Sequence, residues 1–403
     1  MSKMKKITRA TKEFRRTSFV YLDNASTTFP KPDCVYKFMN AFYRQYGVNP
    51  GRAKGYAYQQ AETILERTRD KLTRFFHSEN RNRLIFTYNA TDSLNMIING
   101  ILKNGDHVIT TALEHNAVIR PLNHLALRMH INVDWIGFDK KGFIDPADIK
   151  KKIKKNTKLV IVNHCSNVIG SIQPIKDIGE ICTKAGVIFA LDAAQTAGVV
   201  PIDMEKSHID VVAFTGHKSL LGPMGIGGMQ IRDGVKIEAV RFGGTGILSQ
   251  ERYQPEKFPY YLECGTINMV GVAGLFAAHD YIFEKGIENI YKHEMKLAKM
   301  LCNELRKIDN VVLYNEPVMG KHTAIISFRI KGLDVDKTGA MLETRYGIYS
   351  RTGLHCAPLV HDNIGTMPDG TVRLSIGPFN TAVEIQRTIQ AISEIAENAV
   401  GKS

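Results

Sequence analysis

Between residues 81 and 232 the chain alternates short apolar, β-branched runs with longer amphipathic stretches, and this alternation constrains the fold more than any other feature. Such runs are typical of buried strands, and the stretches between them have the period of helices. The predicted strands are residues 84–87, 107–110, 159–162, 187–191, 211–214 and 227–230, and the predicted helices include 91–103 and 175–185. This order predicts an α/β domain with a mainly parallel sheet, helices on both faces and ligands at the carboxyl ends of the strands.

The remainder of the chain has a different order of elements. A stretch rich in Gly and Pro, 242–266, precedes a long helical run over 270–308, a strand near 323–330, a helix near 335–346 and a last helix over 381–400. This order predicts a smaller α+β lobe, and the mostly helical residues 20–75 are expected to pack against both lobes. We therefore divide the chain into a basic arm (1–19), a large α/β domain (20–265) and a small C-terminal domain (266–403).

Composition narrows the class of protein. With 44% hydrophobic and 23% charged residues among 403, the chain is of the ordinary globular type. Its longest apolar stretch, 269–278, is roughly half of the ~20 residues that a membrane span requires. Six cysteines lack a CxxC pair, so we expect neither a disulfide framework nor a metal site, and we expect a reducing, cytoplasmic compartment.

The net charge of +13 is concentrated near the N-terminus. We interpret the basic arm as a solvated segment, with a docking arm or a transit-like peptide as alternatives. Composition alone does not choose among nucleic acid, a membrane surface and an acidic protein as partners.

Lys218 follows a predicted buried strand in a turn that reads Thr215-Gly216-His217-Lys218-Ser219. Taken alone, it could be an ordinary turn lysine. Asp192, however, ends the preceding predicted strand, so the two side chains should meet at one edge of the sheet. A lysine amine that bonds a carbonyl cofactor, with a carboxylate that polarises the cofactor ring, is the arrangement that pyridoxal 5'-phosphate (PLP) needs.

These motifs, with Gly222-Pro223-Met224-Gly225-Ile226-Gly227 behind them, resemble the class V aminotransferases, and within that family the cysteine desulfurases and selenocysteine lyases. The resemblance runs from about residue 20 to 396. It implies fold type I of the PLP-dependent transferases, with a mainly parallel seven-stranded sheet, and a homodimer.

The resemblance also assigns residues. Lys218 would carry the cofactor, His115 would stack on its ring and help in proton transfer, and Asp192 would hold the ring nitrogen. Thr91, Thr215 and His217 would bind the cofactor phosphate, with Thr266 reaching the phosphate of a neighbouring subunit. Gln195 would hydrogen-bond the ring oxygen, and Asn167 would lie near the cofactor and the substrate. Thr91 opens a predicted helix, whose N-terminus attracts anions.

Cys356 is the residue that separates sulfur transfer from transamination. It lies in Arg351-Thr352-Gly353-Leu354-His355-Cys356-Ala357-Pro358, which resembles the short loop of group II cysteine desulfurases. Positive charge from Arg351 and His355 would favour the nucleophilic thiolate. Arg373 would grip the substrate carboxylate through its planar fork, with Arg351 and Asn167 also near the substrate.

The sequence therefore predicts a PLP-dependent enzyme that converts L-cysteine to L-alanine and leaves a persulfide on Cys356 for a sulfur-acceptor protein. A selenocysteine lyase, or another PLP-dependent lyase of the family, is the open alternative, with L-selenocysteine as substrate. A basic nucleic-acid-binding or scaffold protein is a third reading, which the joint presence of Asp192, His217, Lys218 and Cys356 argues against. We expect no membrane or nucleic-acid partner.

Overall fold

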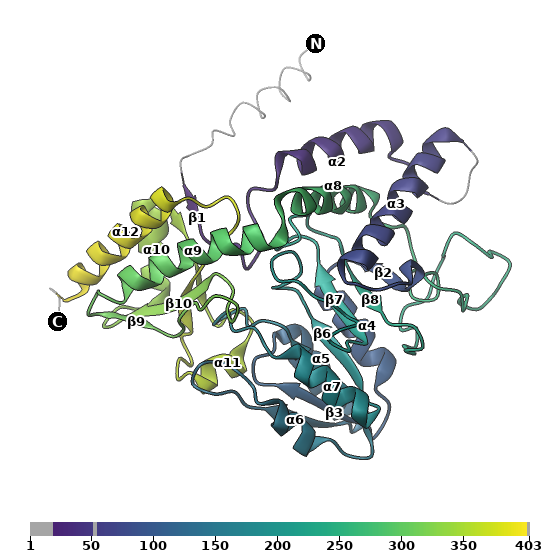
Figure 1. Ribbon diagram of the computed structural model, residues 1–403, viewed down its shortest axis with the longest axis horizontal. Coiled ribbons are helices and arrows are strands. Elements are labelled where there is room, and N and C mark those ends of the chain that lie inside the picture. The colour runs from purple at the N-terminus through teal and green to yellow at the C-terminus, as the bar shows by residue number, and fades with distance from the viewer. Residues whose placement is uncertain (1–18, 51–54, 401–403) are drawn as a thin grey trace, which may run out of the picture.

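The computed structural model describes residues 19–50 and 55–400, and its centre is a seven-stranded sheet (Figure 1). In spatial order its strands are β2 (Leu84–Thr87), β8 (Gly227–Ile231), β7 (Val211–Thr215), β6 (Ile188–Asp192), β5 (Thr157–Asn163), β3 (His107–Thr111) and β4 (Asn132–Ile136). β8 runs antiparallel to β2 and β7, and the other neighbouring pairs are parallel. The predicted α/β fold with a mainly parallel seven-stranded sheet is confirmed.

Helices cover both faces of this sheet because successive strand side chains alternate between two apolar cores. On one face, α4 (Ala90–Ile101) and α5 (Asn116–Met129) pack on side chains such as Ile161 and Ala213. On the other, α3 (Tyr56–Phe75) and α7 (Ile175–Ala185) pack on neighbours such as Val162 and Phe214. A sheet buried on both faces leaves its strand ends as the accessible places for a site.

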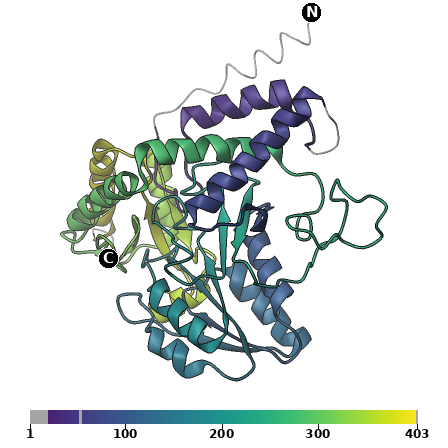
Figure 2. The same ribbon diagram turned by 45° about the vertical axis from the view of Figure 1, so that its right-hand side comes forward.

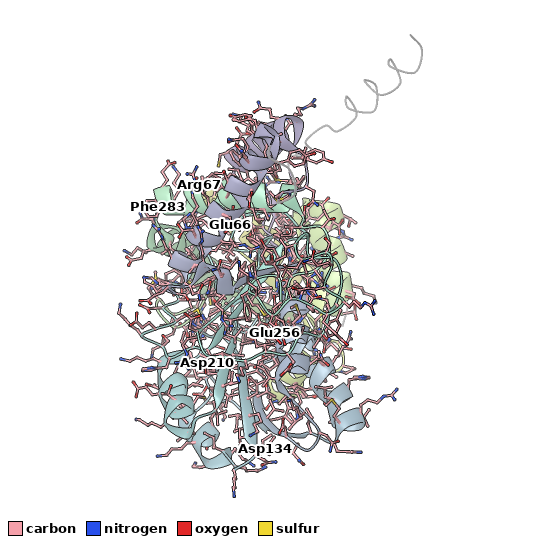
Figure 3. All side chains as sticks on the ribbon, turned by 90° about the vertical axis from the view of Figure 1, so that its right-hand side faces the viewer. Glu66, Arg67, Asp134, Asp210, Glu256 and Phe283 are labelled. Atoms are coloured by element: carbon pink, nitrogen blue, oxygen red, sulfur yellow. The ribbon has the colours of Figure 1, made fainter. Side chains whose placement is uncertain are left out.

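Helix α8 (Met269–Lys285) lies between the sheet and the N-terminal helices α2 (Asp33–Tyr46) and α3. It is apolar on almost all sides, as a helix enclosed by other elements must be. Phe276 of α8 stacks on Phe38 of α2 at 5.3 Å between ring centroids. In Figure 3, Phe283 of α8 lies toward the opposite end of the molecule from Asp134 of the edge strand β4.

The C-terminal part forms a second core around an antiparallel sheet. Its strands, in spatial order, are β12 (Arg351–Gly353), β13 (Thr371–Ser375), β10 (Ile325–Ile330) and β9 (Val311–Leu313). The helices of this part are α9 (Ile287–Leu305), α10 (Val335–Tyr346), α11 (Pro358–Asn363) and α12 (Ala382–Val400), while α6 (Pro146–Lys152) belongs to the large domain. The N-terminal strand β1 (Val20–Tyr21) pairs with β11 (Ile348–Tyr349), so residues 20–75 contact both parts.

Two differences from the sequence prediction have a clear physical reason. The run over 270–308 is two helices, because Gly286 has φ 79°, a left-handed conformation that ends α8 before α9 begins. Edge strand β4 was not predicted, since its residues are mostly half-buried or exposed and lack a continuous apolar run.

The domain boundaries stay a prediction. Buried residues of α8 belong to the core of the large sheet, and those of α9 belong mainly to the C-terminal core. Of the basic arm, residues 1–18 lie outside the described residues. Within the described ranges, no helix is long and apolar enough to cross a membrane, and no three His, Cys, Asp or Glu side chains cluster as metal ligands.

Candidate active site

A cavity of about 260 Å³ opens at the carboxyl ends of the central strands. Asn163, Asp192 and Thr215 line it, and they are the last residues of β5, β6 and β7. The complete lining is Asn89, Ala90, Thr91, Leu94, His115, Ala117, Asn163, Cys165, Asn167, Asp192, Ala194, Gln195, Thr215, His217 and Lys218. The cavity therefore lies where an α/β sheet binds its ligands.

Lys218 stands three residues beyond β7 in a turn held by the N-terminal segment. The carbonyl oxygen of His217 accepts hydrogen bonds from the Thr28 backbone N–H (3.0 Å), the Thr27 hydroxyl (3.0 Å) and the Lys31 amine. Three donors on one carbonyl fix the backbone beside Lys218. Sequence reasoning missed Lys31, since it lies 186 residues from His217 and no local pattern marks the contact.

The pKa of the Lys218 amine lies below its ordinary value. Burial lowers its pKa to about 8, an effect that the negative charge of Asp192 opposes and the positive charge of Arg373 strengthens. The electrostatic influence of Cys356 on this amine acts in the same direction as that of Asp192. A lysine of this kind is neutral in part near pH 8 and can act as a nucleophile or base.

Asp192 is buried at the end of β6, where its Oδ1 accepts a hydrogen bond from the Ala194 N–H (2.9 Å). Burial raises the pKa of its carboxyl, while this hydrogen bond and the Lys218 charge lower it. A buried carboxylate facing a cavity is stabilised by a cationic group placed opposite to it. Asp192 thus fits a ligand that carries a protonated ring nitrogen.

His115 caps the N-terminus of α5. Its Nδ1 accepts the Ala117 N–H (3.0 Å), which leaves the ring proton on Nε2. Burial and the charge of Lys218 lower its pKa to about 4, so the imidazole is neutral at physiological pH. A neutral ring at the cavity wall suits stacking on a flat ligand.

Glu114, next to His115, is a second residue that the sequence did not reveal. It is fully buried and accepts hydrogen bonds from the Thr111 hydroxyl (2.7 Å) and the Asn163 N–H (3.0 Å). Burial raises its pKa to about 8, with a contribution from Asp192. Glu114 is therefore mainly protonated at neutral pH.

One end of the cavity has the features of an anion site. Thr91 lies in the first turn of α4, whose N-terminal backbone N–H groups favour negative charge. The Thr215 hydroxyl and the His217 Nδ1 atom are buried, and neither has a hydrogen-bond partner within the described residues. Buried polar atoms are normally satisfied, so these two are suited to a phosphate.

The loop that carries Cys356 extends from the C-terminal domain to this cavity. The His355 carbonyl accepts a hydrogen bond from the Asn167 side chain (2.7 Å), and the Cys356 carbonyl accepts one from the Asn116 N–H (2.7 Å). His355 and Cys356 have φ values of 50° and 58°, a left-handed conformation that is costly for residues other than glycine. Tertiary contacts thus hold an exposed thiol in a strained turn.

The expected positive charge from His355 beside this thiol is wrong. The imidazole is buried, is hydrogen-bonded to the Thr371 hydroxyl (3.1 Å) and has its pKa lowered by burial to about 2. His355 is therefore neutral, and the cation in this loop is the exposed Arg351. Sequence reading could not foresee the difference because it depends on burial by distant residues.

Arg373 lies in β13 directly opposite Arg351 of β12 and is 2% exposed. Its guanidinium donates to the Asp23 carboxylate (2.8 Å) and the Asn167 carbonyl (2.9 Å). Its Nε atom has no hydrogen-bond partner among the described residues. An incoming carboxylate would therefore meet a guanidinium that Asp23 already orients.

Thr266 lies apart from the other predicted residues. It is exposed and lines two other surface hollows, near Gly244 and Arg241, rather than the cavity of Lys218. Gln195 lines the cavity, and its side-chain nitrogen donates to the Ala25 carbonyl (3.0 Å). Cys165 also lines it, but burial raises its pKa to about 12, so this thiol stays protonated.

Comparison with known proteins identifies the protein family to which this chain belongs. Residues 20–388 match the class-V aminotransferase family, and the chain belongs to it. A probable cysteine desulfurase of Methanothermobacter thermautotrophicus is 34% identical over 94% of each chain, and the cysteine desulfurase of Haloferax volcanii is 30% identical over 94% of this chain and 90% of its own.

Solved structures agree with the sequence relatives. The apo cysteine desulfurase of Thermococcus onnurineus NA1 superposes with a TM-score of 0.89 at 32% identity, covering 94% of this chain and 95% of its own. The cysteine desulfurase CsdA of Escherichia coli gives a TM-score of 0.85 at 25% identity over 94% and 95% of the two chains. The fold and the family are thus established together.

Proposed function

We propose that this chain is a cysteine desulfurase that uses PLP to convert L-cysteine to L-alanine and transfers the sulfur to Cys356. The observation that supports this most is the Lys218 amine beside Asp192 at the strand ends, together with the exposed thiol of Cys356 held near it by Asn116 and Asn167. A transaminase would need the lysine and the aspartate but not the positioned thiol.

The charged and polar side chains around the cavity are placed to suit the phosphate and the ring of PLP. Thr91, Thr215 and His217 would bind the phosphate, since a helix N-terminus, a free hydroxyl and a free imidazole nitrogen meet there. Asp192 would bind the protonated ring nitrogen, and His115 would stack on the ring. When bound, PLP supplies a ring that withdraws electrons from the substrate Cα.

Asn167 and Gln195 would contact the cofactor or the substrate. The side-chain Oδ1 of Asn167 is buried and has no hydrogen-bond partner among the described residues, so it is available to a donor on the ligand. The nitrogen of Gln195 already donates to Ala25, so the side-chain oxygen is the atom that remains available to the cofactor.

Different side chains of the protein would carry out different steps of the reaction. Arg373 and Arg351 would orient the substrate carboxylate, and the Lys218 amine would take the proton from Cα. The Cys356 thiolate would attack the substrate sulfur, forming a sulfur–sulfur bond as the carbon–sulfur bond breaks. Cβ gains a proton, so L-cysteine and the Cys356 thiol yield L-alanine and a persulfide, which a sulfur-acceptor protein would remove.

A homodimer would complete the site. The segment between β8 and α8 extends away from the rest of the chain (Figure 2), and there Phe242 is 71% and Tyr253 89% exposed. A second copy would cover these side chains and bring its own Thr266 to the phosphate. Mixing the Lys218→Ala and Thr266→Ala variants should then restore part of the activity, whereas no recovery would contradict the role of Thr266 in the neighbouring site.

The direct test of the cofactor assignment is chemical. Purified protein reconstituted with PLP should be yellow, and borohydride reduction followed by peptide mass spectrometry should find PLP on Lys218. Lys218→Ala should lose both the adduct and alanine production from L-cysteine. A colourless protein, or an adduct on another lysine, would contradict the assignment.

A further inference from the structure

A second, much smaller cavity lies between the two lobes, behind the turn that carries Lys218. Its volume is about 30 Å³, enough for one or two water molecules or a small ion. Ser219 and Gln195 line it from the large domain, Glu294 of α9 from the C-terminal part, and Thr28 from the N-terminal segment. Residues from three parts of the fold therefore meet around this cavity.

Glu294 is an unusual side chain in this position. It is 7% exposed, and among the described residues it has neither a hydrogen-bond donor nor a cationic partner. Burial alone raises its pKa well above the ordinary value, with no charge nearby to oppose the effect. A lone buried carboxylate is costly, so either a proton or a bound cation must neutralise it.

The other groups around this cavity leave few hydrogen-bond donors for the carboxyl. The Gln195 amide donates to the Ala25 carbonyl (3.0 Å), and the Asn24 amide donates to the Ser375 carbonyl (2.9 Å). The Ser375 hydroxyl donates to the Leu22 carbonyl (3.3 Å). These donors are directed away from Glu294, so the wall presents mainly oxygen atoms.

Two hydroxyl groups remain available. Neither the Thr28 nor the Ser219 side chain has a hydrogen-bond partner in the part of the chain that the structure describes, and both line the cavity with Glu294. A carboxylate with hydroxyl oxygens is the ligand type that hard cations prefer. One carboxylate balances a single positive charge, and among the described residues that line this cavity Glu294 is the one acidic side chain, so a divalent ion would lack a second acidic ligand.

We propose that this cavity binds one monovalent cation, K⁺ or Na⁺, through the Glu294 carboxylate and the hydroxyls of Thr28 and Ser219. The ion would link α9 to the residue that follows Lys218. It would also fix Thr28, whose N–H donates to the His217 carbonyl (3.0 Å). The bound cation would thus stabilise both the contact between the lobes and the lysine turn.

The test is thermal unfolding of the full-length PLP-bound protein in KCl, NaCl or choline chloride at equal ionic strength. The unfolding temperature should rise by about 2 to 4 °C in the chloride of the preferred ion, as expected for a ligand that binds only the folded state. The rise should saturate as the salt replaces choline. Because the readout is unfolding, its failure would leave the proposed desulfurase activity untouched.

Glu294→Gln should remove this difference among the salts, and Glu288→Gln, which changes an exposed carboxylate on the same helix, should retain it. Should the Glu294 variant fail to fold, the wild-type titration decides alone. Equal unfolding temperatures in the three salts, or a rise that stays linear with concentration, would overturn the proposal. In that case Glu294 is a protonated acid beside water.

Discussion

The backbone N–H of Asn116 donates a hydrogen bond of 2.7 Å to the carbonyl oxygen of Cys356. This bond joins the loop of the C-terminal part to the first residue of α5, directly after His115. Cys356 is exposed, but its backbone is not free to move away from the cavity. In the proposed function, the thiol would receive sulfur from a substrate at the strand ends and would still present it to a partner.

Lys31 should position the lysine turn. Lys31→Met removes one of three donors from the His217 carbonyl, so we expect looser PLP retention and turnover lower by about tenfold, as small displacements of catalytic groups cost rate. The dissociation rate of PLP, followed by absorbance, measures the first effect. Lys37→Met, which changes an exposed lysine of α2, is the control. Equal retention in both variants would show that Lys31 has no such role.

Asp192→Asn tests the polarisation of the cofactor ring. The amide keeps the shape of the side chain but loses its charge, so PLP should bind more weakly and alanine production should fall by about a hundredfold or more. Cofactor titration and a rate assay measure the two effects. Asp177→Asn, an exposed change on α7, should match the wild type. Near wild-type turnover of Asp192→Asn would mean that another group polarises the ring.

Glu114 predicts a pH effect on stability. Its pKa is raised from 4.5 to about 8, so between these values the folded chain keeps a proton that the unfolded chain loses. The stability that this group contributes is complete below pH 4.5 and is lost as the pH rises through about 8. Glu114→Gln stays neutral and should lose less stability over this range than the wild type. Parallel unfolding temperatures against pH would contradict a protonated Glu114.

The sequence predicts the parts of this molecule that depend on local pattern. Buried strands β5, β6 and β7 appear as apolar runs, so Asp192 and Lys218 could be placed at strand ends before the structure was known. Edge strand β4 lacks that pattern, and the break at Gly286 follows from one residue within a long amphipathic run.

Most of the site features that the sequence did not predict depend on contacts between residues that are far apart in the sequence. Lys31 meets His217, and Glu114 meets Asn163, only after the chain has folded. The neutral state of His355 likewise follows from burial, which a local reading of Arg351 to Pro358 cannot supply. The sequence thus predicted which residues line the cavity better than it predicted their protonation states.

Alanine production by Cys356→Ala is the most direct test of sulfur transfer. The variant keeps Lys218, Asp192 and Arg373, so it should bind PLP and L-cysteine yet release almost no alanine, while Cys34→Ala, which changes another exposed cysteine, should match the wild type. Wild-type protein treated with L-cysteine should carry one added sulfur atom on the Cys356 peptide, removable by reductant. If Cys356→Ala instead makes alanine at the wild-type rate, the thiol is not the sulfur acceptor, and the chain is a lyase of the same family.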